Sequence, residues 1–459
     1  MTAPFWSLDR VAAALGDAFP SERARTQWPR GQTTLHGVST DTRQIAKGDL
    51  FVALAGERFD AHDFLTDAVA KGASALIVSR PDRTAGLGVP VFAVSDTTVA
   101  LGALGRFRRR AWGKPLVAIT GTNGKTSTKD LTRAALGAAL DVHATTGNLN
   151  NRIGVPLTLL ALRDEADIAV CEMGMSVPGE IATLRAIAEP DIAVVTSVAE
   201  GHLEGLGSIE GVMREKVSIF DGVGVGVVPA AQPEIAEAAK GRARRLVVAG
   251  LESGDLHADD WTVEENGLGR LTVRGVTVRP PLRGFHNLRN SMLALAVAQE
   301  CGVSLERAAE GIAAMPVPAM RLAWEQLGRA TLINDAYNAN PGSMRAAIEL
   351  LDSVGRGRQR VAVLGGMREL GAHAERLHAE IADRALRSSI EVVAGVGEMG
   401  DALRRAGQDD ARVVAAPDID ELWQTLAPRL APDAVILLKA SRGVKLERLV
   451  PHLTAWANG

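Results

Sequence analysis

The 459-residue chain lacks the features that mark secreted, membrane-spanning or nucleic-acid-binding proteins. Its two cysteines, Cys171 and Cys301, are too few for a disulfide framework and suit a reducing compartment. A formal net charge of −3 gives no electrostatic support for broad nucleic-acid binding. The sequence has no uninterrupted apolar run of about twenty residues and no basic start followed by an apolar segment. We therefore expect a cytoplasmic protein with no signal peptide, transmembrane segment or nucleic-acid partner.

The chain is longer than the size at which one hydrophobic core keeps growing, so we expect three domains. A basic stretch at 106–115 ends in Gly and Pro, and two prolines in 313–321 oppose helix continuation. These two breaks predict domains at 1–110, 111–315 and 316–459.

Beyond residue 110, short apolar runs alternate with helix-like stretches, which favours parallel sheets covered by helices on both faces. Helical spacing of apolar residues predicts helices at 126–140 and 288–302. Alternation broken by Asn-Gly and Arg-Gly predicts an antiparallel hairpin set within 261–278, at the edge of its domain. The predicted strands are 116–120, 167–174, 191–198, 245–250, 330–338, 360–367, 391–397 and 433–441.

A Gly-Lys-Thr turn, in "VAITGTNGKTSTKDL" (117–131), joins a predicted strand to a predicted helix. Such a turn aims backbone N–H groups and the positive end of the helix dipole at one point, where Gly121 and Gly124 allow a phosphate to approach. Lys125 supplies a mobile cation, and the hydroxyl of Thr126 is suited to Mg²⁺. The turn predicts nucleoside triphosphate binding, and the alternative is a strand–helix turn with an incidental lysine. The predicted ATP-binding loop is Gly121, Thr122, Asn123, Gly124, Lys125, Thr126 and Ser127.

The loop departs from the common G-x-x-x-x-G-K-[ST] pattern, because Ile119 occupies the first glycine position. "GTNGKT" without that glycine resembles the loop of the Mur ligases and folylpolyglutamate synthases, which are ATP-dependent amide-forming enzymes. The resemblance covers nearly the whole chain. It continues through "GNLNNRIGVPLTLL", "CEMGMSVPGEI", "GHLEGLGS", "HNLRN", "NDAYNANPGSM", "LGGMRELG" and "LLKASRGVKLE". "STDTR", "GDLFVALAGERFDAHDF" and "YNANP" are most similar to the Mur ligases that add D-alanyl-D-alanine, and the "DNPR" motif of the diaminopimelate-adding relatives is absent.

This resemblance implies an α/β fold of three-domain Mur ligase architecture, with a central P-loop parallel-sheet domain and a C-terminal Rossmann-like domain. It implies that the N-terminal domain holds UDP-N-acetylmuramoyl-tripeptide, the central domain ATP, and the C-terminal domain D-Ala-D-Ala. The implied reaction serves peptidoglycan precursor synthesis: a carboxylate attacks the γ-phosphate of ATP, and the dipeptide amine then expels phosphate. Two like unit charges about 4 Å apart repel by roughly 4 kcal/mol at an effective dielectric near 20, so the chemistry requires Mg²⁺. We expect a monomer.

The resemblance assigns metal ligands outside the loop. Glu172, at a predicted strand end, binds one Mg²⁺ with Thr126, and its alternative role is a helix cap. His202 binds a second Mg²⁺, or else is a local hydrogen-bond partner. Lys216 reacts with CO₂ to form a carbamate that serves this second ion, although Ser218 stands where a glutamate is usual; a solvated helix lysine is the alternative. The implied catalytic residues are Lys125, His202 and Lys216.

For the nucleotide, Asn287 and Asn290 share a helix face, and their amides suit the adenine edge. Capping of that helix by Asn287 is the alternative. The resemblance places Arg321 at the terminal phosphates and Asp335 near the ribose, whereas either could simply form a surface ion pair.

Substrate contacts also follow from the resemblance. Ser39, Asp41 and Arg43 of "STDTR" would hold the UDP end, although this segment could equally be a capped turn. The remaining candidates are Asn150 and Asn151 beside the phosphate loop, and Tyr337, Asn338, Ser441 and Arg442 for the acceptor dipeptide.

Other functions remain open to the sequence alone. Another Mur-type ligase or a folylpolyglutamate synthase would differ in its acceptor amine. A non-catalytic nucleotide-dependent module or switch would need no second metal, so Glu172, His202 and Lys216 together favour catalysis. A Rossmann dehydrogenase is disfavoured, because the loop is Gly-Lys-Thr rather than G-x-G-x-x-G.

Overall fold

The computed structural model describes residues 4–16, 34–56, 59–317 and 322–458, and the chain divides into two units. One unit comprises Met1–Leu116, His143–Met173 and Ala182–Pro190, and the other comprises Val117–Val142, Gly174–Ile181 and Asp191–Gly459. Within the described ranges, no helix is long and apolar enough to cross a membrane.

The first unit contains a four-stranded parallel sheet in the order β3-β4-β5-β6. Its longest helix, α4, begins after Asp96, whose side chain accepts the N–H groups of Thr98 and Val99, and ends at the left-handed Gly113. Gly105 lets α4 lie against α6, because an added Cβ would fall 2.9 Å from the Cα of Pro156. The elements are β1 (Trp6–Ser7), α1 (Leu8–Leu15), β2 (Thr34–Leu35), β3 (Val38–Ser39), β4 (Leu50–Val52), α3 (Leu65–Ala70), β5 (Ala75–Val78), β6 (Val91–Ala93), α4 (Thr97–Trp112), α6 (Gly154–Leu160) and β9 (Ile168–Glu172). Three elements run across a unit boundary in the sequence: β7 (Leu116–Thr120), β8 (Val142–Ala144) and α7 (Glu180–Ala188).

The central part of the second unit is built on parallel strands in the order β13-β12-β11-β10-β7. Helix α5 packs against α11 and α12. A separate antiparallel sheet, β14-β15-β16, confirms the predicted antiparallel pairing but does not extend the parallel sheet. The elements are β7 (Leu116–Thr120), α5 (Lys125–Gly137), β10 (Ile192–Val195), α8 (Leu203–Leu206), α9 (Ile209–Val217), β11 (Val225–Pro229), α10 (Pro233–Ala239), β12 (Arg245–Gly250), β13 (Leu256–His257), β14 (Asp260–Val263), β15 (Gly269–Val273), β16 (Val276–Val278), α11 (Phe285–Glu300) and α12 (Leu305–Ala313).

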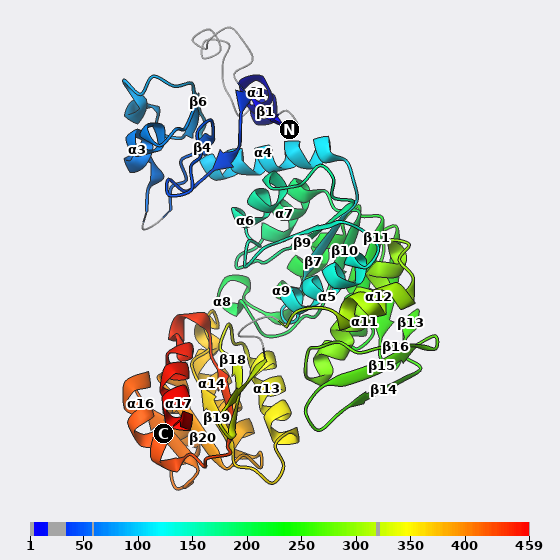
Figure 1. Ribbon diagram of the computed structural model, residues 1–459, viewed down its shortest axis with the longest axis vertical. Coiled ribbons are helices and arrows are strands. Elements are labelled where there is room, and N and C mark those ends of the chain that lie inside the picture. The colour runs from blue at the N-terminus through cyan, green and yellow to red at the C-terminus, as the bar shows by residue number, and fades with distance from the viewer. Residues whose placement is uncertain (1–3, 17–33, 57–58, 318–321, 459) are drawn as a thin grey trace. The chain divides into compact units, whose positions relative to one another are not determined.

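The C-terminal part holds a six-stranded sheet in the order β17-β18-β22-β19-β20-β21, parallel except for β17. Figure 1 shows this sheet between α13 on one side and α16 and α17 on the other. Because β22 lies between β18 and β19, connections diverge there, and such a point in an open sheet leaves a crevice at the carboxyl ends of the strands. The elements are β17 (Ala323–Leu327), β18 (Ala330–Asp335), α13 (Pro341–Ser353), β19 (Arg360–Leu364), α14 (Ala374–Leu386), β20 (Val392–Val396), α15 (Glu398–Ala406), β21 (Val413–Ala416), α16 (Ile419–Leu426), β22 (Val435–Lys439) and α17 (Leu449–Asn458).

The predicted α/β class with parallel sheets is therefore confirmed. Predicted strands 116–120 and 245–250 coincide with β7 and β12, and the other predicted strands overrun the observed ones into adjoining loops. The domain boundaries at 110 and 315 stay predictions.

Candidate active site

The phosphate loop runs from the end of β7 into α5, and two of its residues must be glycine. Gly121 has φ +154°, and an added Cβ would lie 1.9 Å from Oγ1 of Thr196. Gly124 has φ +80°, and a Cβ there would lie 2.7 Å from Oδ1 of Asn290. Both positions combine an unfavourable φ with a close neighbour, so only glycine fits without displacing other groups.

Hydrogen bonds from the segment after β10 hold this loop in place. The N–H of Thr122 donates to the carbonyl of Ser197 at 2.8 Å, and that of Asn123 donates to the Ser197 hydroxyl at 3.0 Å. Thr196 Oγ1 donates to the Asn123 carbonyl at 2.5 Å. Lys125 Nζ lies over the loop, 2.7 Å from the Gly121 carbonyl. These contacts fix the conformation of the loop, and a fixed loop loses less entropy when it binds a ligand.

The "YNANP" segment contacts the phosphate loop across the second unit. Asn340 Nδ2 donates to Oδ1 of Asn123 at 2.7 Å. Asn340 also caps α13 in a reciprocal pair with Ser343, which fixes its side chain. Nearby, Arg345 Nη2 lies 3.1 Å from the carboxylate of Glu200. Sequence reasoning did not assign Asn340 a role, although its motif was recognised.

His202 meets a carboxylate that sequence reasoning also missed. Its Nδ1 lies 2.5 Å from Oε2 of Glu369, and the main chain of both residues has positive φ. Contact with His202 is the largest cause that lowers the pKa of Glu369, and the charge of Lys125 adds to it. The only sequence signal for Glu369 was its place in "LGGMRELG".

Lys216, on α9, is 1% exposed. The alternative of a solvated helix lysine is therefore wrong. Burial, reinforced by the charge of Lys125, lowers the pKa of Lys216 well below its usual 10.5. The interior thus favours the neutral amine.

The candidate ligand Glu172 and two candidate substrate residues lie in the first unit. Glu172 ends β9, is 2% exposed, and accepts a hydrogen bond from Asn150 Nδ2 at 2.8 Å. Asn151 accepts the N–H groups of Ile153 and Gly154, so its side chain supports the start of α6. Asn150 and Asn151 thus have structural contacts of their own, and their substrate roles stay predictions.

The residues present fit a magnesium ion carried by a nucleotide. In the described part of the chain, no group of three or more His, Cys, Asp or Glu side chains is placed to hold a metal. Mg²⁺ in phosphate-transfer sites commonly takes one or two protein ligands, with phosphate oxygens and water completing its octahedron. The hydroxyl of Thr126, buried in the first turn of α5, is a ligand of this kind. Glu172 lies in the other unit, and its role as a ligand stays a prediction.

The predicted adenine contacts form a buried pair. Asn290 Nδ2 donates to Oδ1 of Asn287 at 3.0 Å, and Asn287 Nδ2 donates to the Arg283 carbonyl at 2.7 Å. Gly284 precedes the first residue of α11, so the alternative that Asn287 caps the helix is wrong. Their role toward adenine stays a prediction.

Asp335 forms an interior ion pair rather than a surface one. Its Oδ2 lies 2.6 Å from Nζ of Lys439, whose side chain is 4% exposed, and its Oδ1 accepts the Leu322 N–H at 3.2 Å. Arg321 lies outside the described residues. The roles of Asp335 and Arg321 at the nucleotide stay predictions.

"STDTR" forms the capped turn given as its alternative. The Ser39 hydroxyl donates to the Asp41 carbonyl at 3.0 Å. Nε and Nη2 of Arg43 donate to the two carboxylate oxygens of Asp41. This guanidinium contact lowers the pKa of Asp41 to about 2. The Arg43 side chain is 84% exposed. Contact with the UDP substrate stays a prediction.

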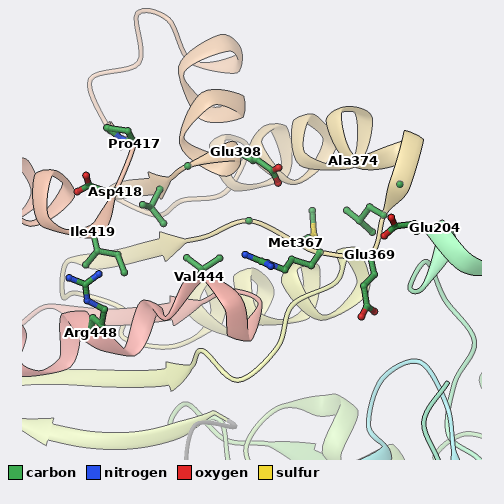
Figure 2. A pocket seen from close by; sticks show the side chains of 16 residues that line it. Glu204, Met367, Glu369, Ala374, Glu398, Pro417, Asp418, Ile419, Val444 and Arg448 are labelled. Atoms are coloured by element: carbon green, nitrogen blue, oxygen red, sulfur yellow. The ribbon is translucent and has the colours of Figure 1, made fainter. Parts of the chain in front are cut away.

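A cavity of about 800 Å³ opens at the carboxyl edge of the C-terminal sheet (Figure 2). Its lining does not include the predicted acceptor residues Tyr337, Asn338, Ser441 and Arg442. The Ser441 hydroxyl accepts the N–H of the lining residue Arg368 at 3.0 Å, and the Asn338 carbonyl accepts from Lys439 at 2.8 Å. The charged residues of the lining are Glu204, Arg368, Glu369, Glu398, Asp418 and Arg448.

A strand, a Gly-Lys-Thr loop and a helix at the carboxyl edge of a parallel sheet define an α/β protein of the phosphate-loop nucleotide-binding class.

Comparison with known proteins narrows this class. Three family patterns match: "Mur ligase family, catalytic domain" at 34–109, "Mur ligase middle domain" at 119–298, and "Mur ligase, glutamate ligase domain" at 320–442. A UDP-N-acetylmuramoyl-tripeptide–D-alanyl-D-alanine ligase of Bacillus subtilis is 37% identical over 92% of this chain and 94% of its own. A MurF crystal structure from Acinetobacter baumannii superposes with a TM-score of 0.89 at 30% identity, covering 99% of this chain and 100% of that one. MurF from Thermotoga maritima, solved in complex with ADP, gives 0.82 at 27% identity, covering 92% and 98%. The chain belongs to the Mur ligase family, in the MurF branch that these relatives represent, and has its three-domain architecture.

Proposed function

We propose that the chain is an ATP-dependent ligase that adds D-alanyl-D-alanine to UDP-N-acetylmuramoyl-tripeptide in peptidoglycan precursor synthesis. The observation that carries the proposal is the preorganised phosphate loop in a chain 37% identical to a ligase of that name. The proposal includes a monomeric, cytoplasmic enzyme.

The phosphate loop is the proposed ATP site. The N–H groups at the start of α5 and the Lys125 ammonium take the terminal phosphates, and the relative solved with ADP supports a nucleotide here. We propose that Asn287 and Asn290 bind the adenine base. Asp335 is the proposed contact of the ribose, and Arg321 that of the terminal phosphates.

We assign Thr126 and Glu172 as ligands of one Mg²⁺ ion. His202 and carbamylated Lys216 are the proposed ligands of a second Mg²⁺ ion. Bound magnesium offsets the repulsion between the substrate carboxylate and the triphosphate. Lys216 suits carbamylation, because a buried, neutral amine is the form that adds to CO₂, releasing one proton and leaving an anionic carbamate. The carbamate on Lys216 carries a negative charge, so it can bind a Mg²⁺ ion.

The cavity of the C-terminal sheet is the proposed acceptor site. D-Ala-D-Ala carries an ammonium and a carboxylate, and the lining offers both signs of charge. Arg368 forms no ion pair among the described residues, so its guanidinium is the candidate for the carboxylate; the carboxylate of Glu398, 72% exposed, is the candidate for the ammonium. The Ser441 hydroxyl accepts the backbone N–H of Arg368 and so helps to position it. Tyr337, Asn338 and Arg442 remain the other candidates at this site. Ser39, Asp41, Arg43, Asn150 and Asn151 stay assigned to the UDP-linked peptide.

The decisive assay supplies ATP, Mg²⁺ and UDP-N-acetylmuramoyl-tripeptide, and compares phosphate release with D-Ala-D-Ala, glutamate and diaminopimelate as acceptors. We expect release only with the dipeptide, together with a peptide lengthened by two residues in mass spectrometry. ADP formation without the longer peptide, or equal stimulation by glutamate, would overturn the proposal.

Arg368→Ala should raise the KM for D-Ala-D-Ala about tenfold or more, because a charge-assisted hydrogen bond is lost. Arg404→Ala is the matched control. Arg404 is half-exposed and pairs with Asp401 on the surface of α15, so its loss should leave KM unchanged.

A further inference from the structure

Five described non-glycine residues of the second unit have positive φ, a conformation that their side chains disfavour, and two of these five contact each other. Glu369 has φ +63° and His202 has φ +56°. A residue other than glycine in this region costs about 1–2 kcal/mol, and such strain persists where the surroundings determine the conformation. The side chains of these two residues meet as an ion pair, with Oε2 and Nδ1 2.5 Å apart, and the buried Nδ1 has no aligned hydrogen-bond partner among the described residues.

Hydrogen bonds to residues of the C-terminal part of the chain hold the segment before Glu369 in place. The Met367 N–H donates to Nε2 of the buried His378 at 2.9 Å. The Arg368 N–H donates to the Ser441 hydroxyl at 3.0 Å, and the Ser441 N–H donates to the Gly366 carbonyl at 3.2 Å. Glu369 is therefore presented from a rigid loop.

The loop also contacts the element that carries His202. The Glu204 N–H donates to the Glu369 carbonyl at 3.2 Å, and a Cβ added to Gly371 would lie 3.1 Å from the Glu204 Cα. Figure 2 shows the Glu369 carboxylate directed away from Glu398 and Asp418, at the margin of the cavity. Its geometry thus favours His202 over a ligand in the cavity.

A carboxylate beside one imidazole nitrogen decides which nitrogen carries the proton. The Glu369 carboxylate, 2.5 Å from Nδ1, favours the tautomer with the proton on Nδ1, which leaves the lone pair on Nε2. Carboxylates paired in this way with histidine ligands fix the ring orientation and raise its basicity.

We propose that Glu369 is a positioning residue: it holds the His202 ring with Nδ1 protonated, so that Nε2 is offered to the metal on the nucleotide phosphates. The proposal rests on the proposed metal role of His202. Arg368, the preceding residue, borders the acceptor cavity, so one rigid loop orders both the histidine and that cavity wall.

The first test reads the tautomer of His202 without nucleotide or metal. Protein labelled with ¹⁵N-histidine is compared by long-range ¹H–¹⁵N NMR, with the His202 signals assigned from their loss in His202→Asn. We expect Nδ1–H in the wild type and a shift toward Nε2–H in Glu369→Ala. Glu375→Gln, an exposed control at the start of α14, should not change the spectrum of His202. Unchanged Nδ1–H in Glu369→Ala overturns the proposal.

The second test measures metal affinity. Mn²⁺ binding to the ADP complex, followed by electron paramagnetic resonance, should weaken about 10–100-fold in Glu369→Ala and less in Glu369→Gln, whose amide oxygen still accepts from Nδ1–H. The Mg²⁺ concentration for half-maximal turnover should rise in parallel, with the KM for D-Ala-D-Ala unchanged.

The outcomes separate this proposal from the one it rests on. Unaltered Mn²⁺ affinity in Glu369→Ala, with weakened binding in His202→Asn, overturns the positioning role and leaves the metal role of His202 intact. Unaltered affinity in His202→Asn overturns both. An effect of Glu369→Ala confined to the KM for the dipeptide assigns Glu369 to the cavity and overturns the positioning role. Glu369→Gln conserves size, so it keeps the test valid if Glu369→Ala fails to fold.

Discussion

The substitution Gly121→Ala tests whether the phosphate loop depends on its fit against the segment after β10. The new Cβ would lie 1.9 Å from Oγ1 of Thr196, so this hydroxyl must move. Moving it breaks the 2.5 Å hydrogen bond to the Asn123 carbonyl. Overpacking of this kind costs about 1–3 kcal/mol. The lost hydrogen bond adds about 0.5–1.5 kcal/mol, since the Ser197 hydroxyl still donates to the same carbonyl at 3.1 Å.

Together these terms cost about 3 kcal/mol. ADP binding should weaken by this amount, because the loop of the variant must return to the wild-type conformation before it can accept the phosphates. About 1.4 kcal/mol corresponds to tenfold in affinity, so isothermal titration calorimetry should show a roughly 100-fold higher Kd for ADP. Gly137→Ala, at the end of α5, is the matched control. Its added Cβ meets no heavy atom within 4 Å, and the Kd should not change.

A second variant isolates the cause. In Gly121→Ala combined with Thr196→Ala, the atom at 1.9 Å is absent, and the next atoms are the Ser197 backbone N and the Cβ of residue 196, both at 3.1 Å. The double variant should therefore bind ADP more tightly than Gly121→Ala alone, giving a favourable coupling energy in a double-mutant cycle. Wild-type ADP affinity in Gly121→Ala, or additive losses in the double variant, would refute this reasoning.

Three further predictions follow from burial. Lys216→Ala should reduce phosphate release about 100-fold or more at ordinary Mg²⁺, and ¹³C-bicarbonate should give a carbamate signal only in the wild type; full turnover would argue against the carbamate. Lys439→Met should lower the free energy of unfolding by about 3 kcal/mol in calorimetry, because it leaves the Asp335 carboxylate buried without its cation. Adding Asp335→Asn removes that unpaired charge and should recover most of the lost stability. If the double variant were no more stable than the single one, the ion pair would not be the cause. Burial raises the pKa of Cys171 to about 12 and that of Cys301 to about 11. A raised pKa leaves less thiolate at pH 8, so alkylation should be on the order of 1000-fold and 100-fold slower, respectively, than for a thiol of pKa near 9. Its rate should rise about tenfold per pH unit and level off only near those pKa values. Rapid alkylation of folded protein at pH 8 would contradict this, and urea-unfolded chain is the control.

Local features were predictable because neighbouring residues determine them. The phosphate loop, the strands β7 and β12, and the shared face of Asn287 and Asn290 all depend on residues a few positions apart. β11 was missed, since the glycines of "DGVGVGVV" weaken its strand pattern.

The contacts that define the candidate site join distant residues. Asn123 and Asn340 are 217 positions apart, and no periodicity or spacing links them. That "STDTR" forms a capped turn was decided by the hydrogen bonds of Ser39 and Arg43, which depend on backbone geometry that the sequence does not give. Its contact with the UDP substrate stays a prediction.

The sequence by itself determined the chemistry of the loop and the α/β class, because glycine flexibility, the lysine charge and apolar alternation act over short distances. Only the tertiary structure decided that Lys216 is buried, that Asp335 pairs with Lys439, and that Glu369 meets His202. Burial and electrostatic contact depend on which surfaces pack together, and packing brings remote segments within a few ångströms of one another.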